Sequence, residues 1–204
     1  KKKIITISPL VKNNVYKLSL LPKKKELFTL LIVGGSQGAS IFDDNLKNII
    51  IRVSKKTPIK IIQQTNEKNK DILSNFYSSH NVENKIFSFD KNFHTILHQV
   101  DLCITRAGAS TLAELSVLKI PFIAVPLPKS KDNHQFENAK FYENNDCCWI
   151  LEQSSFEEKI EQILNEILKK KIDYQKKKEN LEKINYKNTW NNVNQKILEN
   201  INEN

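Results

Sequence analysis

Residues 27–38 read Leu-Phe-Thr-Leu-Leu-Ile-Val-Gly-Gly-Ser-Gln-Gly. The first seven form an apolar run rich in β-branched and aromatic residues, which predicts a short buried strand. The glycines end that run at once, and the amphipathic segment 41–54 that follows predicts a helix. A strand, a glycine-rich turn and a helix in this order are typical of the first unit of an α/β fold.

The same alternation continues along the chain. We expect further strands at 59–63, 85–89, 102–105, 121–125 and 148–151, and helices at 70–78, 93–100, 107–118, 135–144, 156–171, 174–184 and 189–201. This order predicts a Rossmann-like, doubly wound parallel sheet with extra C-terminal helices. Right-handed crossovers then place the loops that leave the strands along one edge of the sheet, where ligands bind.

Composition narrows the class of protein. A hydrophobic content of 39% with 27% charged residues is typical of a soluble globular chain. No apolar run approaches the ~18 residues that cross a bilayer. The three cysteines, two of them adjacent, have the spacing of neither a disulfide framework nor a metal site. This cysteine pattern indicates a reducing cytoplasm.

The net charge of +9 comes almost entirely from lysine, because only Arg52 and Arg106 are arginines among 32 basic residues. Proteins that read nucleic acid rely on arginine and on interleaved aromatic residues. We therefore expect no nucleic-acid partner. Attraction to an anionic membrane surface and a merely solvated lysine surface explain the charge equally well.

Glycine is scarce, and its positions are informative. The chain has 4 glycines, Gly34, Gly35, Gly38 and Gly108, where an average content near 7% predicts roughly 14. It has no methionine, so residue 1 is not a translation start and we expect part of the natural protein to precede it.

The turn Gly34–Gly38 lies between a predicted strand and a predicted helix. Glycines allow the backbone to approach a ligand closely, and the free N–H groups of the helix favour an anion, so a phosphate or diphosphate is the natural occupant, with Ser36 adding a donor. A tight turn without a ligand remains an equal alternative. The spacing fits neither a Walker loop nor the dinucleotide fingerprint.

A second strand ends at the sequence Arg106-Ala-Gly-Ala-Ser-Thr-Leu-Ala-Glu114. Ser110 and Thr111 can cap the next helix or donate to a ligand, and Glu114 can accept the two hydroxyls of a ribose. The local pattern favours another explanation, because Thr111 followed three residues later by Glu114 fits a capping box.

A third loop, proline-bounded at 126–133, leads into the sequence Asp132-Asn-His-Gln-Phe-Glu-Asn-Ala139. His134, Gln135 and Asn138 have helical spacing and share one face. Neutral amides suit sugar hydroxyls, and no second histidine or cysteine has metal-ligand spacing, so we expect neither a metal nor a cofactor.

Taken in order, these three segments resemble the carboxyl-terminal domain of the MurG family. Those bacterial enzymes transfer N-acetylglucosamine (GlcNAc) from UDP-GlcNAc to lipid I, undecaprenyl-pyrophosphoryl-MurNAc-pentapeptide, and yield lipid II for peptidoglycan. The similarity runs from about residue 27 to residue 151, with weaker helical matching beyond.

The resemblance implies the donor-binding half of a two-domain, inverting hexosyltransferase of the GT-B type. It places UDP and its phosphates on Gly35, Ser36, Gln37, Gly38, Gly108, Ala109 and Ser110. It places the uracil beside the backbone of Phe89 and Asp90, the ribose on Glu114, and GlcNAc on Thr111, His134, Gln135 and Asn138. It implies no metal or cofactor, a catalytic base in the absent amino-terminal domain, and a peripheral location on the cytoplasmic face of the bacterial inner membrane.

The resemblance also divides the chain. Residues 1–26 become a linker from a preceding domain, 27–186 the UDP-sugar-binding domain, and 187–204 a C-terminal helix that packs back toward the absent domain. Where the family's linker carries Gly-Asn-Pro-Val-Arg, this chain has Ile7 and Lys12 in place of the glycine and the arginine. Lysine loses a bidentate phosphate clamp.

Other functions remain open at this stage. The chain could be a stand-alone UDP-sugar-binding module without catalysis, or one subunit of a two-chain, lipid-linked GlcNAc transferase that is inactive by itself. Because the resemblance places the acceptor loops and the catalytic base in the absent amino-terminal domain, we expect this chain alone to bind UDP-sugar weakly and to catalyse nothing.

Overall fold

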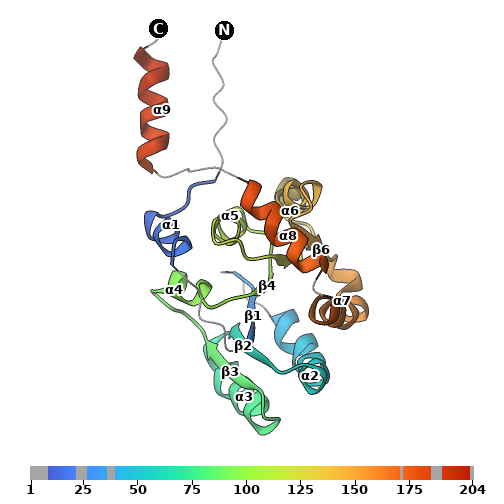
Figure 1. Ribbon diagram of the computed structural model, residues 1–204. Helices are drawn as coiled ribbons and strands as arrows, with labels where there is room; N and C mark the ends of the chain where they lie inside the picture. The colour runs from blue at the N-terminus through green and yellow to red at the C-terminus, as the bar shows by residue number, and fades with distance from the viewer. Residues whose placement is uncertain (1–8, 22–26, 36–39, 171, 185–189, 203–204) are drawn as a thin grey trace.

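A computed structural model describes residues 9–21, 27–35, 40–170, 172–184 and 190–202 (Figure 1). Its centre is a six-stranded sheet in the order β3-β2-β1-β4-β5-β6, in which every strand pairs in parallel with its neighbours. The strands are β1 (Phe28–Val33), β2 (Ile59–Gln64), β3 (Glu83–Phe87), β4 (Leu102–Thr105), β5 (Phe122–Ala124) and β6 (Cys148–Ile150). The expected doubly wound, Rossmann-like sheet is confirmed. β1, β2 and β3 extend the sheet toward one edge and β4, β5 and β6 toward the other, so the strand order reverses between β1 and β4.

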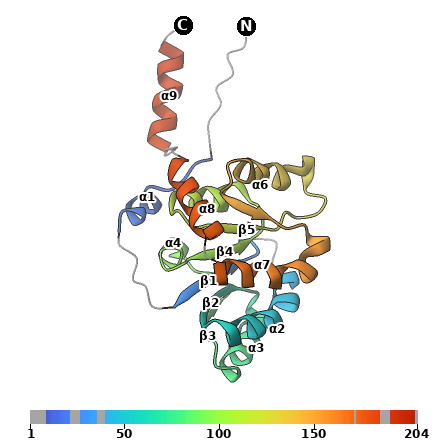
Figure 2. The ribbon, with the colours of Figure 1, turned by 45° about the vertical axis from the view of Figure 1, so that its right-hand side comes forward.

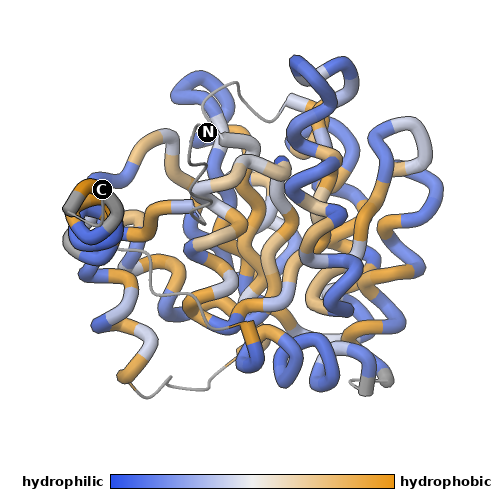
Figure 3. Tube along the Cα trace, turned by 90° about the horizontal axis from the view of Figure 1, so that it is seen from above, coloured by the Kyte–Doolittle hydropathy of each residue, from blue (hydrophilic) through white to orange (hydrophobic). Residues whose placement is uncertain are grey.

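Helices cover both faces of the sheet (Figure 2). They are α1 (Asn13–Ser19), α2 (Ser40–Lys56), α3 (Glu67–Ser79), α4 (Phe93–Leu97), α5 (Ala109–Val117), α6 (His134–Asn144), α7 (Phe156–Lys170), α8 (Ile172–Lys183) and α9 (Trp190–Asn202), with short 3-10 turns at Lys131–Asn133 and Gln153–Ser155. The tube view shows the apolar strands at the centre and the more polar helices around them (Figure 3).

Side-chain alternation along β1 explains the two layers. Leu30 and Ile32 pack into a core with α2, α3 and α7, whereas Leu31 and Val33 pack on the opposite face with α1, α4, α5 and α6. Successive side chains of a strand point to opposite faces, so a strand buried on both sides is continuously apolar. This arrangement accounts for the unbroken apolar run from which the fold was inferred.

The expected boundaries hold for most elements but not for all. β3 begins and ends two residues earlier than the predicted 85–89, because its register is set by pairing with β2, where Lys60 lies opposite Glu83. Their side chains also form an ion pair, with Lys60 Nζ 2.6 Å from a Glu83 carboxylate oxygen. Such a partner lies far away in the sequence, so no local pattern could place this edge strand.

The segment expected to be a linker contains a helix. α1 packs on the same layer as α4 and α5, with Val11 and Val15 almost fully buried. Propensity alone does not favour this short helix, so we attribute it to the burial of those two valines. Ile7, the first of the two departures in the linker, lies outside the described residues.

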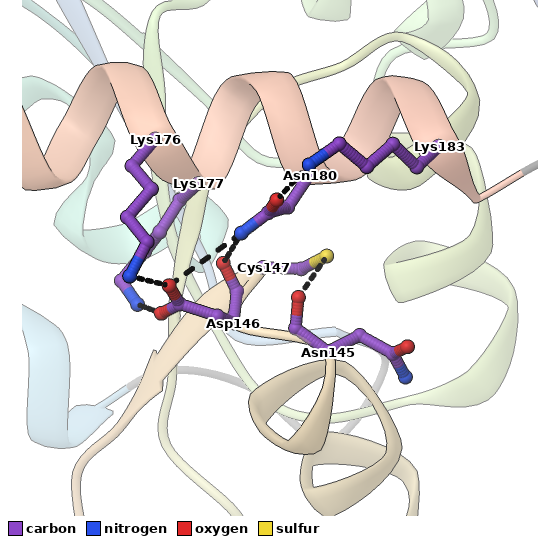
Figure 4. Close-up of polar contacts among 7 residues, drawn as sticks. All are labelled: Asn145, Asp146, Cys147, Lys176, Lys177, Asn180 and Lys183. Carbon is purple, nitrogen blue, oxygen red and sulfur yellow. Dashed lines mark hydrogen bonds and ion pairs between the residues drawn. The ribbon is translucent and has the colours of Figure 1, made fainter.

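Helix α8 is joined to the start of β6 by a polar cluster that we call the α8 clamp: Asp146, Lys176, Lys177 and Asn180 (Figure 4). Lys176 and Lys177 place their Nζ atoms 2.8 and 2.6 Å from the two oxygens of Asp146, and Asn180 donates to the Asp146 carbonyl at 3.1 Å. Lys177 is 8% exposed and also lies over the ring of Trp149. The pKa of Asp146 is lowered, first by the hydrogen bond from Lys176 and then by that from Lys177.

Candidate functional site

A cleft of about 780 Å³ opens where β1, β4 and β5 end. This is the edge and the reversal point at which open α/β sheets bind ligands. Its lining comes from the loops after those three strands, from the turn after β6 and from the starts of α2, α5 and α6. It consists of Gly34, Gly35, Ser40, Ile41, Thr105, Arg106, Gly108, Thr111, Leu127, Pro128, Lys129, Ser130, Lys131, His134, Gln135 and Gln153.

Packing within the described residues does not explain why two positions of the cleft, Gly35 and Gly108, lack a side chain. A Cβ atom built on Gly35 or Gly108 meets no atom of the described residues within 4 Å. Gly35 has a φ of +70°, which favours glycine by itself. Gly108 has an ordinary extended backbone, with φ −70° and ψ 131°. At Gly108, neither conformation nor packing within the described chain therefore explains the lack of a side chain.

Helix α5 begins without a side-chain cap. Its N-cap is Gly108, and among the described residues no side chain accepts a hydrogen bond from the first turn. The capping-box explanation of Thr111 and Glu114 is therefore wrong, since Thr111 lies inside the helix. Leu112 N is the first amide to bond within the helix, to Gly108 O at 3.0 Å. The amides before it are the unsatisfied donors of a helix start, and they give the cleft a positive partial charge.

Gln135 and Asn138, which share one face of α6 as expected, hold the turn that precedes α5. Gln135 Oε1 accepts from the backbone N–H groups of Ala107 and Leu127, at 3.2 and 2.9 Å. Asn138 Nδ2 donates to Ala107 O at 3.0 Å. Within the part of the chain that the structure describes, these bonds leave the NH₂ group of Gln135 and the carbonyl oxygen of Asn138 without a partner, so the two amides present opposite hydrogen-bonding groups.

His134 is the first residue of α6 and lines the cleft. Its Nδ1 lies 2.7 Å from Lys131 O. A carbonyl oxygen can only accept, so Nδ1 carries a proton in this geometry and Nε2 is the ring nitrogen left for another partner.

Arg106 is a cation of the cleft that has no carboxylate partner among the described residues. Its guanidinium donates to Val125 O and Pro126 O at 3.2 and 3.4 Å and to Gln153 Oε1 at 2.7 Å. It also lies over the ring of Phe42, 5.4 Å from the centroid. Desolvation lowers its pKa, but a guanidinium stays charged in proteins. Neutral carbonyl groups thus hold a positive charge beside the glycine turns.

Glu114 is half-buried one turn into α5 and does not line the cleft itself. Burial raises its pKa, while Lys12 and His94 act in the opposite direction. Phe89 and Asp90 follow the end of β3, with Phe89 76% exposed. Asp90 accepts from Asn92 N at 2.8 Å, which fixes the turn after Phe89.

A buried network fixes the first turn of α2, which begins just after the glycine turn. The Asp43 carboxylate, on a residue 4% exposed, accepts from Gln63 Nε2 at 2.8 Å, from Thr65 Oγ1 at 2.5 Å and from Asn69 Nδ2 at 3.1 Å. Tyr77 in turn donates to Gln63 Oε1 at 2.9 Å. Every member has a partner, so the network holds the start of α2 against the end of β2.

The predicted site residues thus divide into three groups. Gly35, Gly108, Thr111, His134 and Gln135 line the cleft. Ala109, Ser110 and Glu114 lie in α5, Asn138 lies in α6, and Phe89 and Asp90 follow β3; none of these six is a lining residue. Ser36, Gln37 and Gly38 lie outside the described residues. Sequence reasoning did not single out Arg106, Lys129, Lys131 or Gln153 as site residues. Only their position next to turn and loop motifs could have indicated them.

Comparison with known proteins matches residues 29–192 to the family described as "Glycosyltransferase family 28 C-terminal domain". The chain is 46% identical over its whole length to the UDP-N-acetylglucosamine--N-acetylmuramyl-(pentapeptide) pyrophosphoryl-undecaprenol N-acetylglucosamine transferase of Pelagibacter ubique, of which it covers 58%. It is 37% identical, over 76% of its length, to the enzyme of the same name from Rickettsia canadensis, and covers 45% of it.

The fold has a matching solved structure. The chain aligns with the crystal structure of Acinetobacter baumannii MurG with a TM-score of 0.65 and 25% identity, over 82% of this chain and 47% of that one. The chain therefore spans about half the length of the proteins it resembles.

Proposed function

The chain belongs to the family of the glycosyltransferase family 28 C-terminal domain, and on that premise we propose that it is the half of an inverting transferase that binds UDP-GlcNAc. The observation that carries this proposal is the cleft at the ends of β1, β4 and β5, where two glycines leave open space beside an uncapped helix. The whole enzyme then transfers GlcNAc to lipid I and yields lipid II for peptidoglycan synthesis.

The diphosphate lies between the two glycine turns, beside Gly35 and Gly108 and on the amides of Ala109 and Ser110. Ser36, Gln37 and Gly38 complete its contacts on the β1 side. A helix start supplies donors and partial positive charge to an anion. Arg106 adds a full charge close by, and its hydrogen bonds to neutral carbonyls leave that charge uncompensated.

The uridine lies on the α4 side of the cleft. Glu114 accepts the two ribose hydroxyls, and the backbone of Phe89 and Asp90 contacts the uracil. The exposed Phe89 ring gives the base an apolar surface to lie on. Lys12 and His94 help to keep Glu114 ionised despite its burial.

The sugar lies toward the start of α6. Gln135 offers its NH₂ group, Asn138 its carbonyl oxygen and His134 its Nε2 atom, while Thr111 closes the corner between phosphate and sugar. Because backbone bonds fix both amides, a sugar hydroxyl meets a defined donor and a defined acceptor. A defined orientation of hydrogen-bonding groups is how a site discriminates between hydroxyl configurations.

In the transfer, an acceptor hydroxyl oxygen forms a bond to the anomeric carbon while the bond from that carbon to the UDP oxygen breaks. The leaving diphosphate gains negative charge, which the α5 amides and Arg106 stabilise. The base that takes the hydroxyl proton belongs to the amino-terminal domain, so this chain alone is inactive.

The domain division fits the surface of α9. This helix stands away from the sheet in both ribbon views (Figures 1 and 2) and exposes Trp190, Ile197, Leu198 and Ile201. We assign residues 27–186 to the donor domain, 1–26 to the connection from the preceding domain, and 187–204 to a helix whose apolar face packs on that domain.

We place the enzyme peripherally on the cytoplasmic face of the inner membrane, where a lipid-linked acceptor is available, with the lysine-rich surface drawn to anionic lipid. Among the described residues, no helix has the length and apolar character that crossing a bilayer requires. Nucleic acid is not a partner in this account.

Calorimetric titration of UDP-GlcNAc, UDP-glucose and ADP-glucose into the full-length protein, which includes the amino-terminal domain, tests the proposal. We expect UDP-GlcNAc to bind best and ADP-glucose worst, and equal or absent binding of all three would refute it. Transfer of GlcNAc to lipid I by the full-length protein, but not by residues 1–204 alone, distinguishes a transferase half from a binding module without catalysis.

A further inference from the structure

Two lysines on the rim of the cleft have no partner. Lys129 and Lys131 line the cleft together with Arg106, and neither lysine side chain forms an ion pair or hydrogen bond with another described residue. No carboxylate is among the residues that line the cleft. Asp132 is adjacent in sequence but exposed, and Glu152 lines a neighbouring cavity of about 370 Å³ that shares Leu127, Pro128 and Gln153 with the cleft. The cleft therefore has more positive charge than its own chain compensates.

The loop that carries these lysines has a defined and costly shape. Lys129, Asp132 and Asn133 have φ values of 58°, 52° and 54°, a conformation that costs a residue with a side chain roughly 1 kcal/mol. The other non-glycine residues described with positive φ each lie just beyond a helix end, where this conformation is usual: Asn81, Lys119 and Asp146. In the lysine loop, Asp132 and Asn133 are residue types that adopt this conformation readily, whereas Lys129 has neither that explanation nor a helix end before it.

Hydrogen bonds hold the loop in place. Ser130 N donates to Leu127 O at 3.2 Å, Asn133 N donates to Ser130 O at 2.9 Å, and Gln135 N donates to Ser130 Oγ at 3.4 Å. Since Leu127 N is itself bound by Gln135, the loop is tied to α6 at both ends. The two lysines thus project from a structured rim.

The rim lies on the sugar side of the donor. It follows β5, two strands away from β1 in the sheet, which is about 10 Å at the usual strand spacing. The donor's diphosphate already has the glycine turns and Arg106 beside β1 and β4. His134 and Gln135, which the proposed function assigns to the sugar, line the same side of the cleft as the rim. We therefore assign an anion at the rim to a group other than the leaving diphosphate.

We propose that Lys129 and Lys131 form a second anion subsite, which receives the diphosphate of the acceptor. This inference rests on the proposed function, because the acceptor named for the relatives is a pyrophosphoryl lipid. Two ammonium groups steer and hold a diphosphate as point charges. The subsite lets the donor domain contribute to acceptor binding.

Pyrophosphate, titrated into the chain saturated with UDP and followed by ¹H–¹⁵N spectra, tests the subsite. We expect the Ser130 amide to shift, and we expect Lys129→Gln/Lys131→Gln to weaken pyrophosphate about tenfold, since each exposed charge contributes about a factor of three to five. A matched control, Lys55→Gln/Lys68→Gln, removes the same charge from exposed lysines without ion pairs elsewhere and leaves pyrophosphate binding unchanged.

Two results would overturn the subsite: UDP abolishes pyrophosphate binding, or the Lys129/Lys131 variant binds pyrophosphate as tightly as wild type. If UDP itself does not bind, the proposed function fails, while pyrophosphate titration without UDP still tests the lysines. In the full-length enzyme, the variant raises KM for the diphosphate-linked acceptor about tenfold and leaves KM for UDP-GlcNAc unchanged. The reverse pattern would assign the lysines to the donor and refute the proposal.

Discussion

Two pairs of lysines in this chain have opposite surroundings. Lys176 and Lys177 of the α8 clamp meet on the carboxylate of Asp146 and join α8 to the start of β6 (Figure 4). Lys129 and Lys131 lie on the rim of the cleft, where no carboxylate lines the wall. The first pair uses its charge within the fold, whereas the charge of the second pair is available to a ligand.

The same contrast extends to the uncharged groups. In the clamp, the buried polar atoms have partners from the chain itself. In the cleft, the α5 amides have no cap, and Gly108 leaves space that no described atom fills. We therefore expect substitutions in the cleft to reduce ligand binding with little effect on stability, and substitutions in the clamp to do the reverse.

The largest expected effect is that of Gly108→Ala. A methyl group at this position enters space assigned to the diphosphate, and such overpacking costs about 2 kcal/mol, or roughly 30-fold in UDP affinity. The free energy of unfolding stays within about 1 kcal/mol of wild type, because the backbone angles suit alanine while the N-cap position slightly disfavours it. Calorimetry and urea unfolding measure the two quantities; wild-type UDP affinity in this variant would place the diphosphate elsewhere.

Asp146→Asn comes next and acts in the opposite way. It leaves the nearly buried ammonium of Lys177 without its carboxylate, and we expect a loss of about 1 to 2 kcal/mol of unfolding free energy, less than for a fully buried pair because the Asp146 side chain is 41% exposed. UDP affinity stays unchanged. A loss of binding as large as the loss of stability would show that the two regions are coupled.

The pH dependence of stability sharpens this prediction. The pKa of Asp146 is lower in the folded chain than in the unfolded chain. The stability that this carboxylate contributes is therefore fully present above the ordinary carboxyl pKa of about 3.9, and it is lost as the pH falls through the pKa of the folded state. The stability difference between wild type and Asp146→Asn therefore shrinks below about pH 4. Urea unfolding at a series of pH values checks this, and a difference that persists unchanged at the lowest pH would contradict it.

Glu114→Gln has a smaller effect on binding. An amide keeps one acceptor for the ribose, so we expect about a five- to tenfold loss of UDP affinity at neutral pH. Burial raises the pKa of Glu114, so wild-type affinity falls on acidification as the carboxylate takes up a proton, while that of the variant is nearly constant. Parallel pH profiles for the two proteins would exclude Glu114 as the ribose ligand.

The smallest expected effect is that of Lys176→Gln. Its side chain is 65% exposed, and Asp146 keeps Lys177 as a partner. We expect no measurable change in unfolding free energy or in UDP affinity. A clear loss of stability would mean that both lysines of the clamp are needed.

The sequence predicts most of the sheet because the buried strands are locally distinctive. β4 begins and ends at the predicted residues, and β1 and β2 differ by a single residue at one end. The failures are elements fixed by distant contacts. α1 depends on burying Val11 and Val15, and β3 depends on its pairing with β2.

The candidate site is predictable where glycines and turns mark it, and less so elsewhere. Because glycine is scarce in this chain, its few positions alone are enough to single out Gly35 and Gly108. The bonds of Gln135 to Ala107 and Leu127, and those of Arg106 to the loop after β5, have no local signal, because each joins segments that meet only in the folded chain. The helix expected at 107–118 is confirmed by α5, which has Gly108 as its N-cap, and only the alternative explanation of Thr111 as the start of a capping box is wrong.

Backbone amide hydrogen exchange with and without saturating UDP-GlcNAc tests the central claim most directly. If the donor lies against the start of α5, we expect slower exchange at the amides of Ala109, Ser110 and Thr111 and in the loop at 127–135, unchanged exchange in α8, and little effect of ADP-glucose. Unprotected α5 amides in the presence of bound UDP-GlcNAc, or protection confined to another surface, would contradict it.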